Sequence, residues 1–200
     1  MEIKEIKIKI IDMADRIWQI LGLIEKGFME NKLEPLSDAI KEENHINEAE
    51  KILTKNIIEL SKIMKNAESK QELMIMEQMV ETLESMGDEA ANIIERIEIK
   101  VIENLLFSDL GVRQFNETFS AMKKSVEMMR EFLNKKNPEL KERVIDNGFH
   151  VKGLVERYRK EHFERLIQGL CTPMAANMYF DMLDFTGNLA RHSSSIVKLF

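Results

Sequence analysis

The chain has 200 residues and a formal net charge of −6, with acidic and basic side chains interspersed. This pattern argues against a nucleic-acid groove and against a strongly basic membrane-binding surface. The single cysteine, Cys171, leaves no internal disulfide to form, which fits a reducing, cytoplasmic setting. The sequence shows neither a signal-peptide pattern nor an apolar run approaching the roughly 20 residues of a transmembrane helix.

The composition predicts an all-α protein with no sheet. Only three prolines and eight glycines occur, and no segment alternates polar and apolar residues between turn signals, as a strand would. The first helix carries an apolar seam with the 3,4 spacing of a heptad repeat, and it should end near Asn31 because Pro35 prevents continuation. The residues of this seam are Ile3, Ile6, Ile10, Met13, Ile17, Ile20 and Ile24.

Two further helices complete the first half. The second helix is predicted over residues 36–65, and residues 66–69 form the turn that follows it. Ser69 followed by Glu72 has the spacing of a capping box, so the third helix should begin there. We expect that helix to end near Phe107, just before Gly111.

The second half repeats this plan 103 residues later. The shift carries Pro35 to Pro138 and the Ser69 cap to Thr172, with Pro173 at the first helical position. Short connections make consecutive helices antiparallel neighbours. We therefore expect two tandem antiparallel three-helix bundles, over residues 1–108 and 109–200. The helices predicted for the second half lie near 112–134, 139–169 and 173–200.

Oxygen-bearing side chains form a stripe on two neighbouring helices of the first half. Glu84 and Asp88 lie one turn apart on the third helix, and Glu43, Asn47 and Glu50 share a face of the second. If the two helices run antiparallel about residue 67, Glu50 lies level with Glu84 and Asn47 with Asp88. Carboxylates packed this closely repel unless one is protonated or a cation lies between them. These residues therefore predict a metal site, although a solvated face without metal gives the same spacing.

The second half does not repeat these ligands. At the same shift, Glu84 becomes Gly187 and Asp88 becomes Arg191, and a guanidinium cannot ligate a metal. The residues that replace Glu43, Asn47 and Glu50 are then Asp146, His150 and Gly153. Any metal site is therefore expected in the first bundle, and the metal motif of the second is degenerate.

These motifs resemble the PhoU family, whose domain is a pair of three-helix repeats. The run Leu83–Glu89 is similar to the family's Leu-Glu-Arg-Ile-Gly-Asp-His-type signature, with the Arg and His positions changed to Ser85 and Glu89. Glu43–Asn47 matches the acidic-Ile-Asp/Asn pattern of the family's second helix. In the second half, Tyr158–Leu166 looks like the version fused behind sodium/phosphate cotransporters. The closing Glu-Arg-x-x-Asp element of that version is replaced, with Gly187, Asn188 and Arg191 in its place.

The resemblance implies a non-catalytic cytoplasmic regulator of phosphate transport and signalling. Its partner would be a phosphate transporter or sensor at the cytoplasmic face of the membrane. The family holds multinuclear iron, zinc or other cations through its acidic pairs. The residues do not distinguish iron, zinc, Mg²⁺, Mn²⁺ or Ca²⁺, or the absence of any metal. They also leave open whether the chain forms a homo-oligomer and whether it regulates positively or negatively. The implied metal ligands are Glu84, Asp88, Glu43, Asn47 and Glu50.

Two alternatives belong to other classes. The chain could serve as a metal-free helical interaction or scaffold module, with its helices providing only a docking surface. A di-iron oxidase would need two Glu-x-x-His pairs, and only Glu42 and His45 have that spacing. No Gly-rich phosphate loop and no nucleophile with an assignable base is present, so we predict no enzyme. The basic residues around His162 are expected to form a solvated face.

Overall fold

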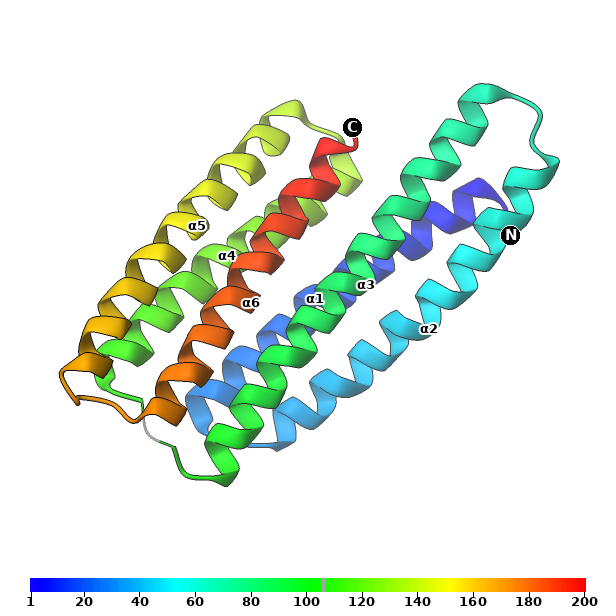
Figure 1. The fold of residues 1–200 in the computed structure, drawn as a ribbon. Coiled ribbons are helices and arrows are strands. Elements are labelled where there is room, and N and C mark those ends of the chain that lie inside the picture. The colour runs from blue at the N-terminus through cyan, green and yellow to red at the C-terminus, as the bar shows by residue number, and fades with distance from the viewer. Residues whose placement is uncertain (106) are drawn as a thin grey trace.

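Six helices account for nearly all of residues 1–105 and 107–200, the part of the chain that the computed structural model describes (Figure 1). No strand occurs within these residues, so the all-α prediction is confirmed. In this described part of the chain, none of the helices has an apolar stretch long enough to cross a bilayer. The helices are α1 (Ile3–Glu30), α2 (Glu34–Ile63), α3 (Ala67–Ile102), α4 (Asp109–Lys135), α5 (Pro138–Ile167) and α6 (Pro173–Lys198).

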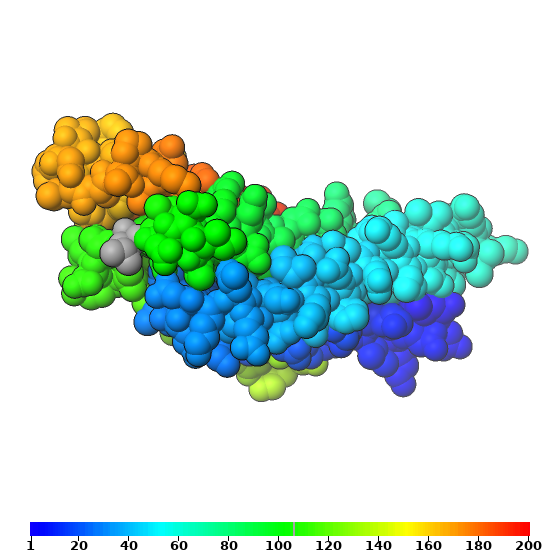
Figure 2. Space-filling view, turned by 90° about the horizontal axis from the view of Figure 1, so that it is seen from below, coloured from blue at the N-terminus to red at the C-terminus, as the bar shows by residue number. Residues whose placement is uncertain are grey.

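The helices form two antiparallel bundles that lie side by side. Helices α1–α3 make one bundle and α4–α6 the other, and they meet where α3 packs against α6 and α1 against α4 (Figure 1). One apolar core runs through both bundles. At their boundary the rings of Phe28 and Phe115 lie 4.6 Å apart between centroids. Figure 2 shows the elongated outline, with the turn between α5 and α6 (orange) standing out at one corner.

The helix ends follow the capping residues, with two corrections to the predicted bounds. Thr172 caps α6 as predicted, since its hydroxyl accepts a hydrogen bond from the Ala175 amide. Helix α3 is capped by Asn66 rather than Ser69, because Asn66 is an equally strong cap that comes three residues earlier. The same helix ends at Ile102, not near Phe107.

The two bundles correspond residue by residue, but not at a single shift. From α3 to α6 the buried positions repeat 103 residues later, as Val80 and Leu183 illustrate. From α1 to α4 and from α2 to α5 they repeat 105 residues later, as Ile46 and Val151 illustrate. The predicted shift of 103 is therefore wrong for the first two helices of the repeat. The change of shift arises between the last two helices of each repeat: Ile57 and Leu73 are 16 residues apart, whereas their counterparts His162 and Ala176 are 14 apart.

Candidate metal centre between the second and third helices

Gly87 allows α2 to approach α3 closely beside the predicted site. A Cβ atom at Gly87 would lie 3.5 Å from Ile46 Cγ2 and 3.9 Å from Glu43 Cγ. Residue 87 thus faces residues 43–46. This register of α2 against α3 differs by less than one helical turn from the register expected from the sequence. The acidic stripes of the two helices therefore share one surface.

On α2, the site contains a buried carboxylate and an incompletely bonded amide. Glu43 is 7% exposed, and its Oε1 accepts a hydrogen bond of 2.6 Å from Asn47 Nδ2. The other amide atom, Asn47 Oδ1, is buried without a hydrogen-bond partner among the described residues. One turn further along, Glu50 Oε1 accepts a 3.1 Å hydrogen bond from the Thr54 hydroxyl. A buried carbonyl oxygen without a donor has free capacity to accept one or to ligate a cation.

On α3, the pKa of Glu84 is raised by its surroundings in this site. Burial is the main cause that raises the pKa of Glu84 above its ordinary value of 4.5, and the charges of Asp88, Glu50 and Glu43 raise it further, in that order. The neighbouring carboxylates are therefore close enough to Glu84 to disfavour its ionised form. A bound cation would relieve this repulsion.

The side chains do not form a preformed coordination shell. Within the described residues, no group of three or more His, Cys, Asp and Glu side chains converges closely enough to hold a metal ion. Asp88 is exposed, whereas Glu43 is buried behind it against Gly87. The residues fit a cation in donor chemistry and charge, and ligation by all five stays a prediction.

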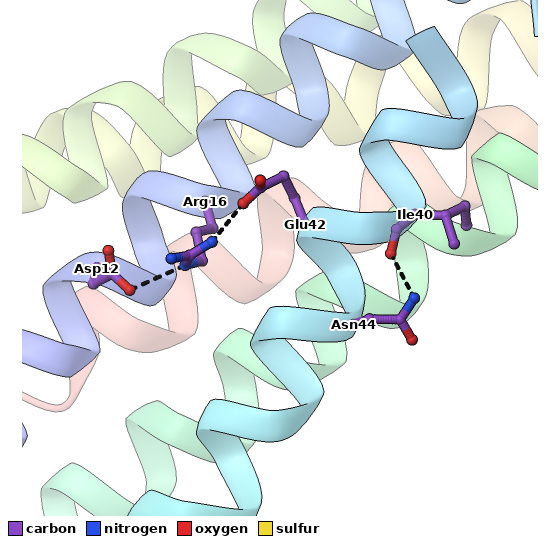
Figure 3. A network of polar contacts seen from close by, with 5 residues as sticks. All are labelled: Asp12, Arg16, Ile40, Glu42 and Asn44. Atoms are coloured by element: carbon purple, nitrogen blue, oxygen red, sulfur yellow. Dashed lines mark hydrogen bonds and ion pairs between the residues drawn. The ribbon is translucent and has the colours of Figure 1, made fainter. Parts of the chain in front are cut away.

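Glu42 and His45 do not join this cluster. Glu42 Oε2 accepts a 2.6 Å hydrogen bond from Arg16 on α1, and Arg16 also contacts Asp12 (Figure 3). His45 is exposed. In the single Glu-x-x-His pair, Glu42 is therefore paired with Arg16 of α1, and His45 is exposed to solvent. This arrangement gives no support to a di-iron centre. The neighbouring Asn44 amide donates to the carbonyl of Ile40 within α2 (Figure 3).

A polar cluster near the start of α6 was missed by the sequence interpretation. His162 is buried rather than part of a solvated face, and its ring stacks on Tyr179 with centroids 4.2 Å apart. The sequence did contain a signal for this burial, because Leu154, Tyr158 and His162 follow one another at helical spacing on the apolar stripe of α5.

The hydrogen bonds of His162 define its tautomer. Arg165 Nη2 donates to Nδ1 at 2.8 Å, because a guanidinium has no acceptor atom. The neutral ring then carries its proton on Nε2, which lies 3.6 Å from Cys171 Sγ. Burial and the Arg165 charge lower the pKa of His162 to about 4, so the ring is neutral at pH 7. In this tautomer Nε2 is a donor toward the sulfur and does not act as a base.

The structural counterpart of the acidic site in the second bundle differs from the predicted one. At the shift of 105 that relates α2 to α5, Glu43, Asn47 and Glu50 correspond to Gly148, Lys152 and Val155. The predicted counterparts Asp146, His150 and Gly153 are instead exposed on the outer face of α5. For α6 the shift of 103 holds, so Gly187 and Arg191 do replace Glu84 and Asp88.

Comparison with known proteins identifies the fold. No protein-family model and no curated protein matches the sequence. The structure is similar to that of PhoU from Pseudomonas aeruginosa, with a TM-score of 0.91, 14% identity and coverage of 98% of this chain and 93% of that chain. For the phosphate transport system regulatory protein PhoU from Streptococcus pneumoniae, the TM-score is 0.85 at 11% identity, covering 98% and 91% of the two chains.

A third similar structure is a putative PhoU-like phosphate regulatory protein from Shewanella oneidensis. Its TM-score is 0.67 at 13% identity, and the match covers 97% of this chain and 96% of that chain. All three similarities span nearly the whole chain at low identity, so they establish its architecture. The resemblance seen in the sequence is therefore confirmed for the fold, and the chain adopts the six-helix fold of PhoU proteins.

Proposed function

We propose that the protein is a non-catalytic cytoplasmic regulator of phosphate transport or phosphate signalling. The observation that carries this proposal is the match to PhoU over 98% of the chain at a TM-score of 0.91. Its partner would be a phosphate transporter or sensor at the cytoplasmic face of the membrane.

Deletion of the encoding gene in its native host tests this role. The expected result is altered phosphate uptake, or altered expression of phosphate-responsive genes, when phosphate is changed from limiting to replete. Uptake of radiolabelled phosphate and a transcriptional reporter measure the two outputs. Restoration by the intact gene is the control. If the deletion strain matches the parent in both outputs under both conditions, the proposed role is wrong.

We further propose that a metal ion binds between α2 and α3. Glu43, Asn47 and Glu50 would hold it from α2, with Glu84 and Asp88 from α3. Two observations support this assignment: neighbouring carboxylates help to raise the pKa of Glu84, and Asn47 Oδ1 has no hydrogen-bond partner among the described residues. When bound, the ion would supply positive charge that joins the two helices. Because no preformed shell is present among the described side chains, we expect the exposed carboxylates to change rotamer on binding.

Calorimetric titration of chelator-treated protein with Mn²⁺, Fe²⁺ and Zn²⁺, together with elemental analysis, tests the metal proposal. We expect at least one of these ions to bind, and Glu84→Gln or Asp88→Asn to weaken that binding at least tenfold. Glu48→Gln removes the same charge from the exposed face of α2 and should leave affinity unchanged. Binding of none of the three ions, or equal affinity in all variants, would contradict the proposal.

One observation favours the alternative of a metal-free docking module. Four large apolar side chains are exposed around the turn between α5 and α6, on the corner that stands out in Figure 2. They are Phe163 (53% exposed), Ile167 (72%), Leu170 (66%) and Met174 (50%). Exposed apolar groups gathered in this way are typical of contact surfaces. Chelator treatment that leaves both the melting temperature and partner pull-down unchanged would support this alternative over the metal proposal.

A further inference from the structure

A groove lies between α5 and α6, where the second bundle corresponds to the acidic site of the first. Its volume is about 600 Å³. The residues that replace the five predicted metal ligands all line it, namely Gly148, Lys152, Val155, Gly187 and Arg191. Three oxygen donors have thus been replaced by residues without a polar side chain, and the other two by cations. The acidic site of the first bundle therefore corresponds, in the second bundle, to a groove that carries positively charged groups.

The two glycines bring the helices together beneath the groove. A Cβ atom at Gly148 would lie 2.4 Å from Ser194 Oγ, and one at Gly187 would lie 3.3 Å from Val155 Cγ2. These contacts place Val155 opposite residue 187, so the antiparallel helices also set Lys152 level with Arg191. The groove is therefore lined by two cations at the same level, one on each helix, together with Gly148, Gly187 and Val155.

The charges around the groove leave positive groups available for a ligand. Glu156 and Asp184 also line the groove, but each is paired with a cation: Lys152 lies 3.7 Å from Glu156 in an exposed pair, and Asp184 is bonded to Arg159. Among the described residues, neither Arg191 nor Lys198 has a carboxylate within 4.0 Å, although Arg191 is close enough to Glu89 on α3 to lower its pKa. Lys198 lies seven residues beyond Arg191 on α6, which is about 10 Å along the helix.

An apolar surface adjoins these cations. Phe149 lies one turn from Lys152 on α5, is 67% exposed and lines the same groove together with Ile145. A phosphate needs charged donors, whereas a planar ring needs an aromatic or aliphatic surface to cover it. The groove offers both next to each other, and its volume lies in the range of small-molecule sites, roughly 300–1,000 Å³.

We propose that this groove binds a phosphorylated small molecule of mononucleotide size. Its phosphate would lie between Arg191 and Lys152, and its planar apolar part would cover Phe149 and Val155. The proposal concerns the second bundle and is independent of metal binding in the first. It would stand even if deletion of the gene left phosphate uptake unchanged.

Isothermal titration of the purified full chain with adenosine 5′-monophosphate, adenosine and inorganic phosphate tests the proposal. We expect the monophosphate to bind with a dissociation constant below 1 mM, and adenosine and phosphate each to bind at least tenfold more weakly. Arg191→Gln should weaken the monophosphate at least tenfold, because Arg191 is exposed and its loss removes a phosphate contact without affecting the core. Phe149→Ala should weaken the monophosphate but leave the affinity for inorganic phosphate unchanged.

Arg143→Gln is the matched control, since it removes an exposed arginine of α5 that does not line the groove. Circular dichroism melts of each variant verify folding. No detectable binding of the monophosphate at 10 mM would overturn the proposal. Equal binding by wild type and Arg191→Gln, or adenosine binding as tightly as its monophosphate, would do so as well. Inorganic phosphate binding as tightly as the monophosphate would overturn the organic part of the assignment.

Discussion

The imidazole of His162 shows how one side chain can make stability depend on pH. It is 3% exposed, stacks on Tyr179 and accepts a hydrogen bond from a guanidinium. Protonation would place a second cation beside Arg165 in a buried site. The ring is therefore kept neutral by its surroundings, and its pKa falls from 6.5 to about 4.

This depressed pKa predicts acid sensitivity in a defined range. Below pH 6.5 the unfolded chain takes up a proton at His162 that the folded chain does not, so the free energy of unfolding decreases as the pH falls toward 4. The loss from this residue should reach about 2–3 kcal/mol. Urea unfolding at pH 7.0, 5.5 and 4.5 measures it. His162→Phe should flatten the profile by this amount, whereas substitution of the exposed His150 by Gln should not.

Glu84 predicts the opposite dependence in metal-free protein. Because its folded pKa is raised, the folded chain holds the proton more tightly, and stability falls as the pH rises above 4.5. Glu84→Gln should remove that part of the profile, measured by the same unfolding series. A profile identical to wild type would show that the pKa of Glu84 is not raised in the folded chain. Glu48→Gln serves again as the control.

Close contacts between helices depend on single glycines. A Cβ atom at Gly27 of α1 would lie 2.5 Å from Cδ2 and 2.8 Å from Cγ of Leu36, which is fully buried at the start of α2. Gly22, on the same helix, has no atom within 4 Å of the equivalent position. Alanine substitutions at these two glycines therefore separate the effect of helix packing on stability from the effect of helix propensity.

Gly27→Ala should lower the free energy of unfolding by about 1–3 kcal/mol, because Leu36 must leave its packed position. Gly22→Ala should raise it by about 0.5–1 kcal/mol, since alanine favours the helix and meets nothing. Denaturant unfolding measures both. Equal effects of the same sign would mean that the α1–α2 contact does not constrain the Gly27 position.

Contacts between the bundles predict that the molecule unfolds as one cooperative unit. Trp18 on α1 lies beneath Lys123 and Arg130 of α4, with 5.1 Å and 5.4 Å between the cationic groups and the ring centroid. Arg130 also pairs with Asp15, and Lys123 bonds to Glu25 at 2.6 Å. Together with the shared core, these contacts predict that neither bundle unfolds alone.

Trp18, the only tryptophan, reports on this boundary. Its fluorescence and the circular dichroism of all six helices should therefore give the same denaturation midpoint. Two separated transitions would show that the bundles unfold independently. As a control, quenching of Trp18 by iodide should increase only in the unfolded baseline.

The fold could be predicted because its signals are local and repeated. Heptad-spaced apolar residues such as Ile17 and Leu83 point to helix faces, and both are buried. Thr172 and Pro173 identified the start of α6. The start of α3 could not be decided from local signals, because Asn66 and Ser69 are comparable caps and only packing selects between them.

The candidate site could be predicted only in part, because it depends on register. The approach of Glu43 to Gly87 followed from an antiparallel pair with a short turn. The counterpart residues in the second bundle could not be predicted in this way. The shift for α5 is 105 rather than 103, and a difference of two residues rotates its side chains away from the expected face. Burial of His162 depends on contacts with Tyr179, which is 17 residues away and on another helix.

The inverted charge of the two related sites gives the molecule an electric asymmetry. The carboxylates around Glu84 lie along α2 and α3, whereas Lys152, Arg191 and Lys198 line the groove between α5 and α6, in the other bundle (Figure 1). Approaching molecules would therefore be guided into a preferred orientation, with the basic flank of one copy drawn toward the acidic flank of another. Such guidance fades within a Debye length, about 8 Å at physiological ionic strength. Because every copy carries a formal net charge of −6, this orienting effect competes with a general repulsion between copies, and added salt weakens both.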